Sequence, residues 1–133
     1  KTSGGKYVAP QILENTFKQS RFIEQIMVIG DGEKMPAAFI QPNFEFVREW
    51  ATRHNNSSFA TNEELCNSKM VIDRIQEEID QCNEKFGNWE KVKRFELTPD
   101  VWSIVDGHLT PTMKLKRKII KEKYNDLYQK IYG

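Results

Sequence analysis

The sequence predicts a single α+β domain, in which a small and mostly antiparallel sheet of about three strands is covered by helices. Two observations favour this class: a β-hairpin pattern lies early in the chain, and amphipathic helical patterns surround the remaining strand pattern. A length of 133 residues suits one domain with one hydrophobic core. Neither an internal repeat nor a low-complexity segment divides the chain.

The first helix is expected over residues 11–20, because Pro10 suits a first helical turn and apolar residues follow at a spacing of four. Two short apolar runs come next, at residues 26–29 and 37–40. The turn sequence GDGE follows the first run, and this arrangement predicts a β-hairpin.

Asn43 is expected to cap a second helix that ends near residues 54–56. A longer helix is expected over residues 68–86, with a core-facing stripe of Ile72, Ile75, Ile79, Cys82 and Phe86. Alternating apolar and charged residues at 92–97 predict the third strand. One final helix is indicated by the spacing of Ile120, Tyr124, Leu127 and Ile131.

The composition argues against several classes of protein. No apolar run approaches the roughly 18 residues of a membrane span, and the first residues do not resemble a signal peptide, so we expect a soluble, cytoplasmic protein. Cys66 and Cys82 are expected to be reduced, core-packed thiols. His54 and His108 belong to no short metal-ligand pair, so no metal site is expected, and we place His108 in a solvent-exposed loop.

The C-terminal end is strongly basic. The net charge is only +1, yet residues 114–133 hold seven Lys or Arg residues against two acidic ones. Such an end can attract nucleic acid, anionic lipid or a phosphorylated small ligand, and charge alone does not choose between them. A nucleic-acid-binding module therefore stays open as an alternative, although the aromatic pattern of an RNA-recognition sheet is missing, and so does a purely structural or interaction domain.

Two motifs could carry chemistry. Residues 3–10 read SGGKYVAP, in which two glycines allow a tight turn or a close approach to a ligand, and a structural turn is the commoner explanation. Residues 109–118 read LTPTMKLKRK, in which a Thr-Pro-Thr segment precedes a cluster of cations. A lysine held there by a rigid loop could meet negative charge on a phosphate or carboxylate oxygen, but composition does not select which lysine.

The two motifs occur in this order, about a hundred residues apart, and together resemble the C-terminal domain of adenylate-forming enzymes, in particular long-chain fatty acid-CoA ligases. Glu14, four residues past Pro10, also matches this pattern. The resemblance spans essentially residues 1–133, which would form one C-terminal domain. It implies a large N-terminal adenylation domain that these residues do not include. The chain alone is therefore expected to be inactive, as a fragment or processed form would be.

The resemblance implies a two-step reaction. Fatty acid and ATP, with Mg²⁺, give acyl-AMP and pyrophosphate, and coenzyme A then displaces AMP to form the thioester. Lys114 aligns with the lysine that contacts the α-phosphate and the substrate carboxylate during adenylation. Ser3, Gly4, Gly5 and Lys6 align with the loop that lines the channel for the pantetheine arm of coenzyme A. Mg²⁺ is not expected to bind to this domain.

The expected partners follow from the same resemblance. They are the enzyme's own N-terminal adenylation domain, together with fatty acid, ATP and coenzyme A, and they include no nucleic acid. Peripheral association of the complete enzyme with a membrane is a further expectation. Lys116, Arg117 and Lys118 are interpreted as solvated charges at a helix start. Related ligases that stop at the acyl-adenylate, or that acylate a carrier protein, remain as alternatives.

Overall fold

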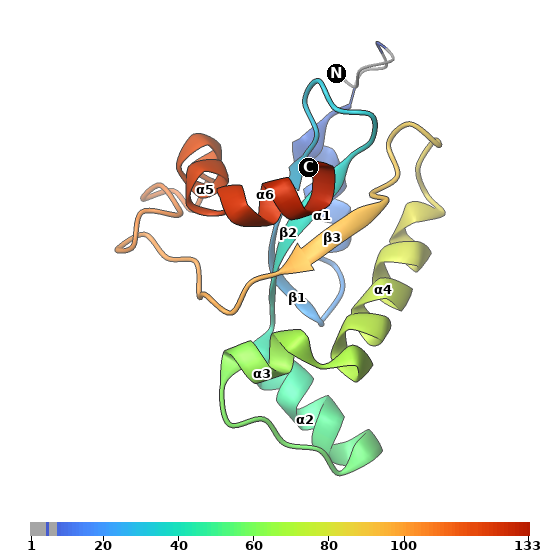
Figure 1. Ribbon diagram of the computed structural model, residues 1–133, viewed down its shortest axis with the longest axis vertical. Coiled ribbons are helices and arrows are strands. Elements are labelled where there is room, and N and C mark those ends of the chain that lie inside the picture. The colour runs from blue at the N-terminus through green and yellow to red at the C-terminus, as the bar shows by residue number, and fades with distance from the viewer. Residues whose placement is uncertain (1–4, 6–7) are drawn as a thin grey trace.

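The structure, a computed structural model, describes Gly5 and residues 8–133. Its core is a three-stranded sheet in the order β1-β2-β3, with helices on both faces (Figure 1). The elements in chain order are α1 (Pro10–Phe17), β1 (Ile23–Ile29), β2 (Ala37–Pro42), α2 (Phe44–Asn55), α3 (Asn62–Asn67), α4 (Lys69–Asn83), β3 (Arg94–Leu97), α5 (Arg117–Lys123) and α6 (Asn125–Tyr132). The α+β class predicted from the sequence is confirmed.

The sheet combines two kinds of pairing. β1 and β2 form the predicted antiparallel hairpin, with Met27 opposite Phe39. β3 pairs with β2 in parallel, in a shorter ladder that runs from Ala37↔Arg94 to Ile40↔Leu97. The parallel pairing follows from the long connection through α2, α3 and α4, which returns the chain to the starting end of β2.

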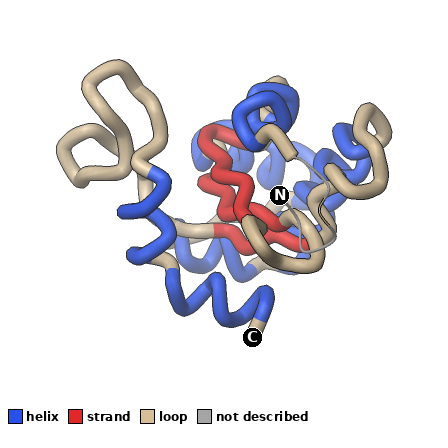
Figure 2. Tube along the Cα trace, turned by 90° about the horizontal axis from the view of Figure 1, so that it is seen from above, coloured by secondary structure: helices blue, strands red, loops and turns tan. Residues whose placement is uncertain are grey.

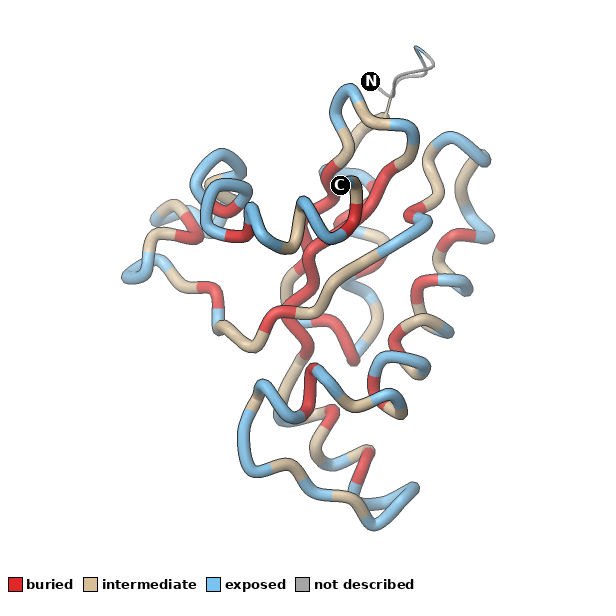
Figure 3. The backbone as a smooth tube through the Cα atoms, in the orientation of Figure 1, coloured by how far each residue is buried: buried red, intermediate tan, exposed pale blue. Residues whose placement is uncertain are grey.

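Both faces of β2 and of the second half of β1 are buried, which explains the apolar runs at residues 26–29 and 37–40 (Figure 3). Ile26 and Val28 of β1 face a cluster that also contains buried residues of α1, α3 and α4. Met27 and Ile29 face a second cluster, built with Trp102 and with residues of α5 and α6. The second cluster attaches the basic C-terminal end to the sheet.

α2 begins as the sequence predicts, because the Asn43 side chain accepts the Phe46 N–H at 3.1 Å. The other helices differ from the sequence predictions in three places. α3 was not predicted, and Thr61 caps it by accepting the Glu64 N–H. The prediction of a single final helix is wrong, since the helix breaks at Tyr124 into α5 and α6. In α4, Ile72 is exposed and Val71 is buried in its place.

The remaining general expectations concern thiols and membranes. Both cysteines are free: Cys66 is buried, and the half-buried Cys82 packs against the same core cluster. Among the helices formed by the described residues, none is long and apolar enough to cross a bilayer.

Candidate functional site

Lys114 lies near the tip of a tight hairpin between β3 and α5. Leu109 and Leu115 form an antiparallel bridge at its base. Above the bridge, the Thr110 N–H donates to the Lys114 carbonyl at 2.8 Å, and the Lys114 N–H donates to Thr110 Oγ1 at 3.0 Å. The segment between β3 and α5 projects from one side of the molecule, as both Figure 1 and Figure 2 show. The main chain of Lys114 is therefore fixed in a protruding loop.

The turn of this hairpin contains a residue in an unusual conformation. Met113 has φ of 67°, which is in the left-handed region, and its N–H donates to the Thr110 carbonyl at 2.8 Å. A side chain with a Cβ adopts this region only at some energetic cost, and such positions are frequent at functional sites. The Lys114 ammonium group has no hydrogen bond or ion pair with any residue that the structure describes. The loop thus presents a cation that no side chain in the described part of the protein engages.

Arg117 anchors the hairpin to the first helix. Its guanidinium donates to both carboxylate oxygens of Glu14, at 2.7 and 2.6 Å. This pairing raises the pKa of Arg117 above its ordinary value. Arg117 is exposed, as expected, with 42% of its side chain accessible, but it is ion-paired as well as solvated. Lys118 is also exposed, as expected. Glu14 is itself buried and also accepts the Val28 N–H at 2.7 Å.

His108 is another correction, because it is only 1% exposed and does not lie in a solvated loop. Its ring stacks on Trp102, with ring centroids 6.1 Å apart. Nδ1 accepts the Ser103 N–H at 3.1 Å, and Nε2 lies 2.8 Å from Lys123 Nζ. Burial and the neighbouring Lys123 ammonium lower the pKa of His108 below its ordinary value.

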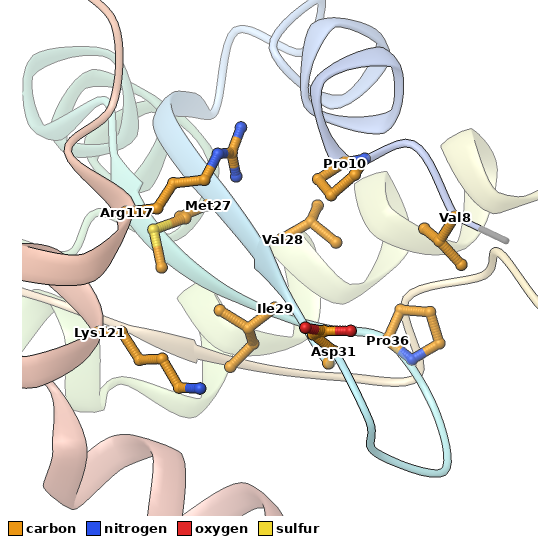
Figure 4. Close-up of a pocket in the computed structure, with 10 residues that line it drawn as sticks. Val8, Pro10, Met27, Val28, Ile29, Asp31, Pro36, Arg117 and Lys121 are labelled. Carbon is orange, nitrogen blue, oxygen red and sulfur yellow. The ribbon is translucent and has the colours of Figure 1, made fainter. Parts of the chain in front are cut away.

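Two cavities flank the strand β1, and Arg117 contributes to the walls of both. The smaller one has a volume of about 250 Å³, and Lys114, Glu14 and Lys18 are among its lining residues. The larger one, of about 380 Å³, has an apolar floor along β1 (Figure 4). In Figure 4, Arg117 and Lys121 extend into it from α5, opposite Pro10 and Pro36. Cations thus line both hollows beside the Lys114 hairpin.

The other predicted site residues lie at the N-terminal end. Gly5 has φ of +83°, and a Cβ atom added there would meet no atom within 4 Å. Its backbone therefore has the left-handed conformation that favours glycine, next to open space. Ser3, Gly4 and Lys6 lie outside the described residues, so their predicted role stays a prediction.

The described residues do not fit a metal ion. No group of three or more His, Cys, Asp or Glu side chains gathers within Gly5 and residues 8–133 in a way that could hold one. Divalent magnesium prefers carboxylate and water oxygens in a nearly octahedral arrangement. No chemical step is therefore assigned to Mg²⁺ on this chain.

Two features of the site were not deduced from the residues. Glu14 is expected in the first helix and matches the family pattern, but nothing in its spacing indicates a partner 103 residues later. The buried position of His108 was also missed. The only sequence feature that points to its burial is the apolar residue Leu109, which directly follows it.

Comparison with known proteins gives a consistent family. The sequence profile described as AMP-binding enzyme C-terminal domain matches residues 2–133. The long-chain-fatty-acid-CoA ligase FadD15 of Mycobacterium tuberculosis is 32% identical over 132 residues, covering 99% of this chain and 22% of that protein. Human long-chain-fatty-acid-CoA ligase 1 is 34% identical over 137 residues, covering 100% of this chain and 19% of that protein. The chain thus spans about a fifth of the length of these relatives.

Solved structures show the same fold. The adenylation domain of a carboxylate reductase from Mycobacterium chelonae superposes with a TM-score of 0.77 at 21% identity, covering 98% of this chain and 19% of that one. A Mycobacterium tuberculosis fatty acyl CoA synthetase gives 0.58 at 15% identity, covering 96% and 20%. The profile match across nearly all residues and the identity to the ligases agree with this fold, and the chain belongs to the AMP-binding enzyme C-terminal domain family.

Proposed function

We propose that this chain is the C-terminal domain of a long-chain fatty acid-CoA ligase and acts together with an N-terminal adenylation domain. The names of the relatives and their identities of 32% and 34% support this proposal. In the complete enzyme, fatty acid, ATP and coenzyme A are the substrates. Any Mg²⁺ used with ATP would be held by residues outside this chain. We place the complete enzyme in the cytoplasm, with peripheral attachment to a membrane.

The observation that carries the proposal is the ammonium group of Lys114, which has no partner among the described residues, on a hydrogen-bonded, protruding hairpin. In the first step, a carboxylate oxygen of the fatty acid attacks the α-phosphorus of ATP, and the bond to pyrophosphate breaks. Negative charge is shared among the reacting oxygens during this displacement. A positioned cation stabilises that charge without reorganisation, which is the role proposed for Lys114.

In the second step, the thiolate sulfur of coenzyme A attacks the acyl carbon, and AMP leaves with the electrons of the broken bond. The pantetheine arm must reach the acyl-adenylate through a narrow passage. The open space beside Gly5 supports a place for this passage along Ser3, Gly4, Gly5 and Lys6. Lys114 and the glycine loop would serve in turn, by rotation of this domain about a hinge.

Substituting Lys114 in the complete enzyme tests this assignment. Lys114→Ala is expected to lower adenylation, measured as fatty-acid-dependent exchange between ATP and pyrophosphate, by about 100-fold or more. Thioester formation from supplied acyl-AMP should stay near that of the unmodified enzyme. Lys118→Ala is the matched control, because Lys118 is also an exposed lysine of the basic segment. Unchanged exchange in Lys114→Ala would refute the assignment.

A second assay addresses the acyl acceptor. The complete enzyme is supplied with fatty acid and ATP, and then with coenzyme A or with a phosphopantetheine-bearing carrier protein. We expect acyl-CoA to accumulate, and the chain alone to form none. Acylation of the carrier protein alone, or accumulation of acyl-AMP with both acceptors, would instead assign the enzyme to a different class of adenylate-forming ligase.

A further inference from the structure

His108 lies directly beneath the hairpin that carries Lys114. Its main chain closes the base of that hairpin: the His108 N–H donates to the Ser103 carbonyl at 3.0 Å, and the His108 carbonyl accepts the Lys116 N–H at 2.9 Å. The next residue, Leu109, forms the bridge to Leu115. A shift of His108 therefore moves both strands of the hairpin.

The ring of His108 is fixed by contacts on three sides. Trp102 stacks against its face, with an interplanar angle of 17°. The Ser103 N–H points at Nδ1, and the Lys123 ammonium lies against Nε2. The ring thus connects the loop before the hairpin to the helix α5 after it. It thereby holds Ser103, before the hairpin, close to Lys123, at the end of α5.

Both polar neighbours of the ring are hydrogen-bond donors. A neutral imidazole has one nitrogen lone pair, so it satisfies the Ser103 N–H in one tautomer and the Lys123 ammonium in the other. A protonated imidazole has no lone pair and would satisfy neither. Protonation would also place a second positive charge 2.8 Å from Lys123 Nζ. The observed arrangement therefore favours a neutral ring, which satisfies one of the two donors, over a protonated ring, which satisfies neither.

The other charged groups around the ring do not reverse this preference. Asp100 and Asp106 favour the protonated form, but Asp100 is 3.6 Å from Lys123 Nζ and is also engaged by the Tyr124 hydroxyl at 2.9 Å. The combined effect of burial and Lys123 is larger, so the pKa of His108 lies below its ordinary value. Protonation thus occurs only in acid, and it opposes the packed geometry.

We propose that His108 is a positioning residue for Lys114, and that it holds the hairpin in the geometry for adenylation only while its imidazole is neutral. This inference rests on the proposed role of Lys114 in the first step. Adenylation should decline in acid as His108 becomes protonated. Thioester formation should not follow the same decline, because Lys114 has no part in the second step.

The test compares the two histidines of the chain in the complete enzyme. His108→Asn replaces Nδ1 with an amide oxygen that accepts a hydrogen bond at every pH. This variant should keep most of the adenylation rate near pH 8 and lose the decline seen in acid. His54→Asn is the matched control, because His54 is exposed at the end of α2, and it should decline in acid like the unmodified enzyme.

A third variant separates positioning from general stability. His108→Leu leaves the Ser103 N–H and Lys123 without the ring, and it should lower adenylation about tenfold at every pH while the rate from supplied acyl-AMP is kept. An acid decline in His108→Asn equal to that of His54→Asn would overturn the proposal. So would an equal loss of both half-reactions in His108→Leu. If Lys114→Ala leaves adenylation unchanged, the proposed function fails instead, whatever the histidine variants show.

Discussion

Arg117 and Glu14 form a bidentate ion pair across 103 residues of sequence, with N–O distances of 2.7 and 2.6 Å. Arg117 is three residues past Lys114, and Glu14 is on the helix that follows the glycine loop. The pair therefore joins the segments proposed to act in the two half-reactions. A bidentate pair fixes orientation as well as distance, so the Lys114 hairpin has a defined position relative to α1.

Arg117→Ala should destabilise the chain by about 2 kcal/mol, between the values for exposed and buried pairs, because the guanidinium is partly exposed and Glu14 is left buried without it. Urea unfolding followed by circular dichroism measures this loss. Lys69→Ala is the control, since the Lys69–Asp73 pair is exposed and should contribute less than about 0.5 kcal/mol. Equal losses of unfolding free energy in the two variants would show that the Arg117–Glu14 pair stabilises the chain no more than an exposed ion pair does.

Tyr124→Phe should destabilise the junction of α5 and α6. The Tyr124 hydroxyl accepts the Trp102 indole N–H at 3.0 Å and donates to Asp100 at 2.9 Å. Removing it leaves a buried indole N–H without its acceptor, at a cost of about 1–3 kcal/mol. The unfolding free energy gives the loss, and Trp102 fluorescence should change in the folded state. Tyr128→Phe, which removes a single bond to Glu33, should cost less, and the reverse order would contradict the network.

The two thiols should react at different rates. Burial, with a smaller contribution from Glu63, raises the pKa of Cys66 to about 12, and burial also raises that of Cys82. At pH 8, iodoacetamide should modify the half-buried Cys82 before Cys66, and in urea both should react alike. Peptide mass spectrometry measures the two rates. Faster modification of Cys66 in the folded chain would contradict its burial.

The same shift gives a sign for the pH dependence of stability. Because the folded pKa of Cys66 lies above the unfolded value of about 8.5, the thiol form is favoured by folding. This contribution is fully present below the unfolded pKa and is lost as the pH rises toward 12. The unfolding free energy should therefore fall above about pH 8.5, and Cys66→Ala should fall less steeply.

Met113→Gly tests the strained turn of the hairpin. Glycine adopts a φ of 67° without the cost of a Cβ, which is about 1 kcal/mol, and the exposed Met113 side chain contributes little burial. The variant should keep or slightly raise the thermal midpoint, whereas Met113→Val should lower it and also lower adenylation in the complete enzyme. Equal midpoints for Gly and Val would show that the left-handed conformation is not retained in solution.

Local signals account for the parts of the fold that the sequence predicts well. The GDGE turn specifies the β1–β2 hairpin, and the Asn43 cap specifies the start of α2. The break at Tyr124 has no such signal, because the apolar spacing continues through it. The hydroxyl contacts with Trp102, Thr98 and Asp100, all distant in sequence, accompany that break instead.

The candidate site also has features that the sequence predicts and features that it does not. Lys114 was selected among several lysines by resemblance, and the structure adds that its ammonium group is unengaged among the described residues. The ion pair of Arg117 and the burial of His108 are not predicted, because charge and loop position indicate neither a distant partner nor burial. Their environments depend on Glu14 and Lys123, which approach only after the chain has folded.

The hydrogen bond between Glu14 and β1 also affects whether the edge of the sheet can pair with a strand of another molecule. β1 is an outer strand of the sheet, and an uncovered outer strand invites pairing with a strand of another molecule. Here the Val28 N–H already donates to a carboxylate that is held by Arg117. A buried charge at that position makes an added strand unfavourable. Glu14, which orients the Lys114 hairpin through Arg117, thus also disfavours aggregation through the β1 edge of the sheet.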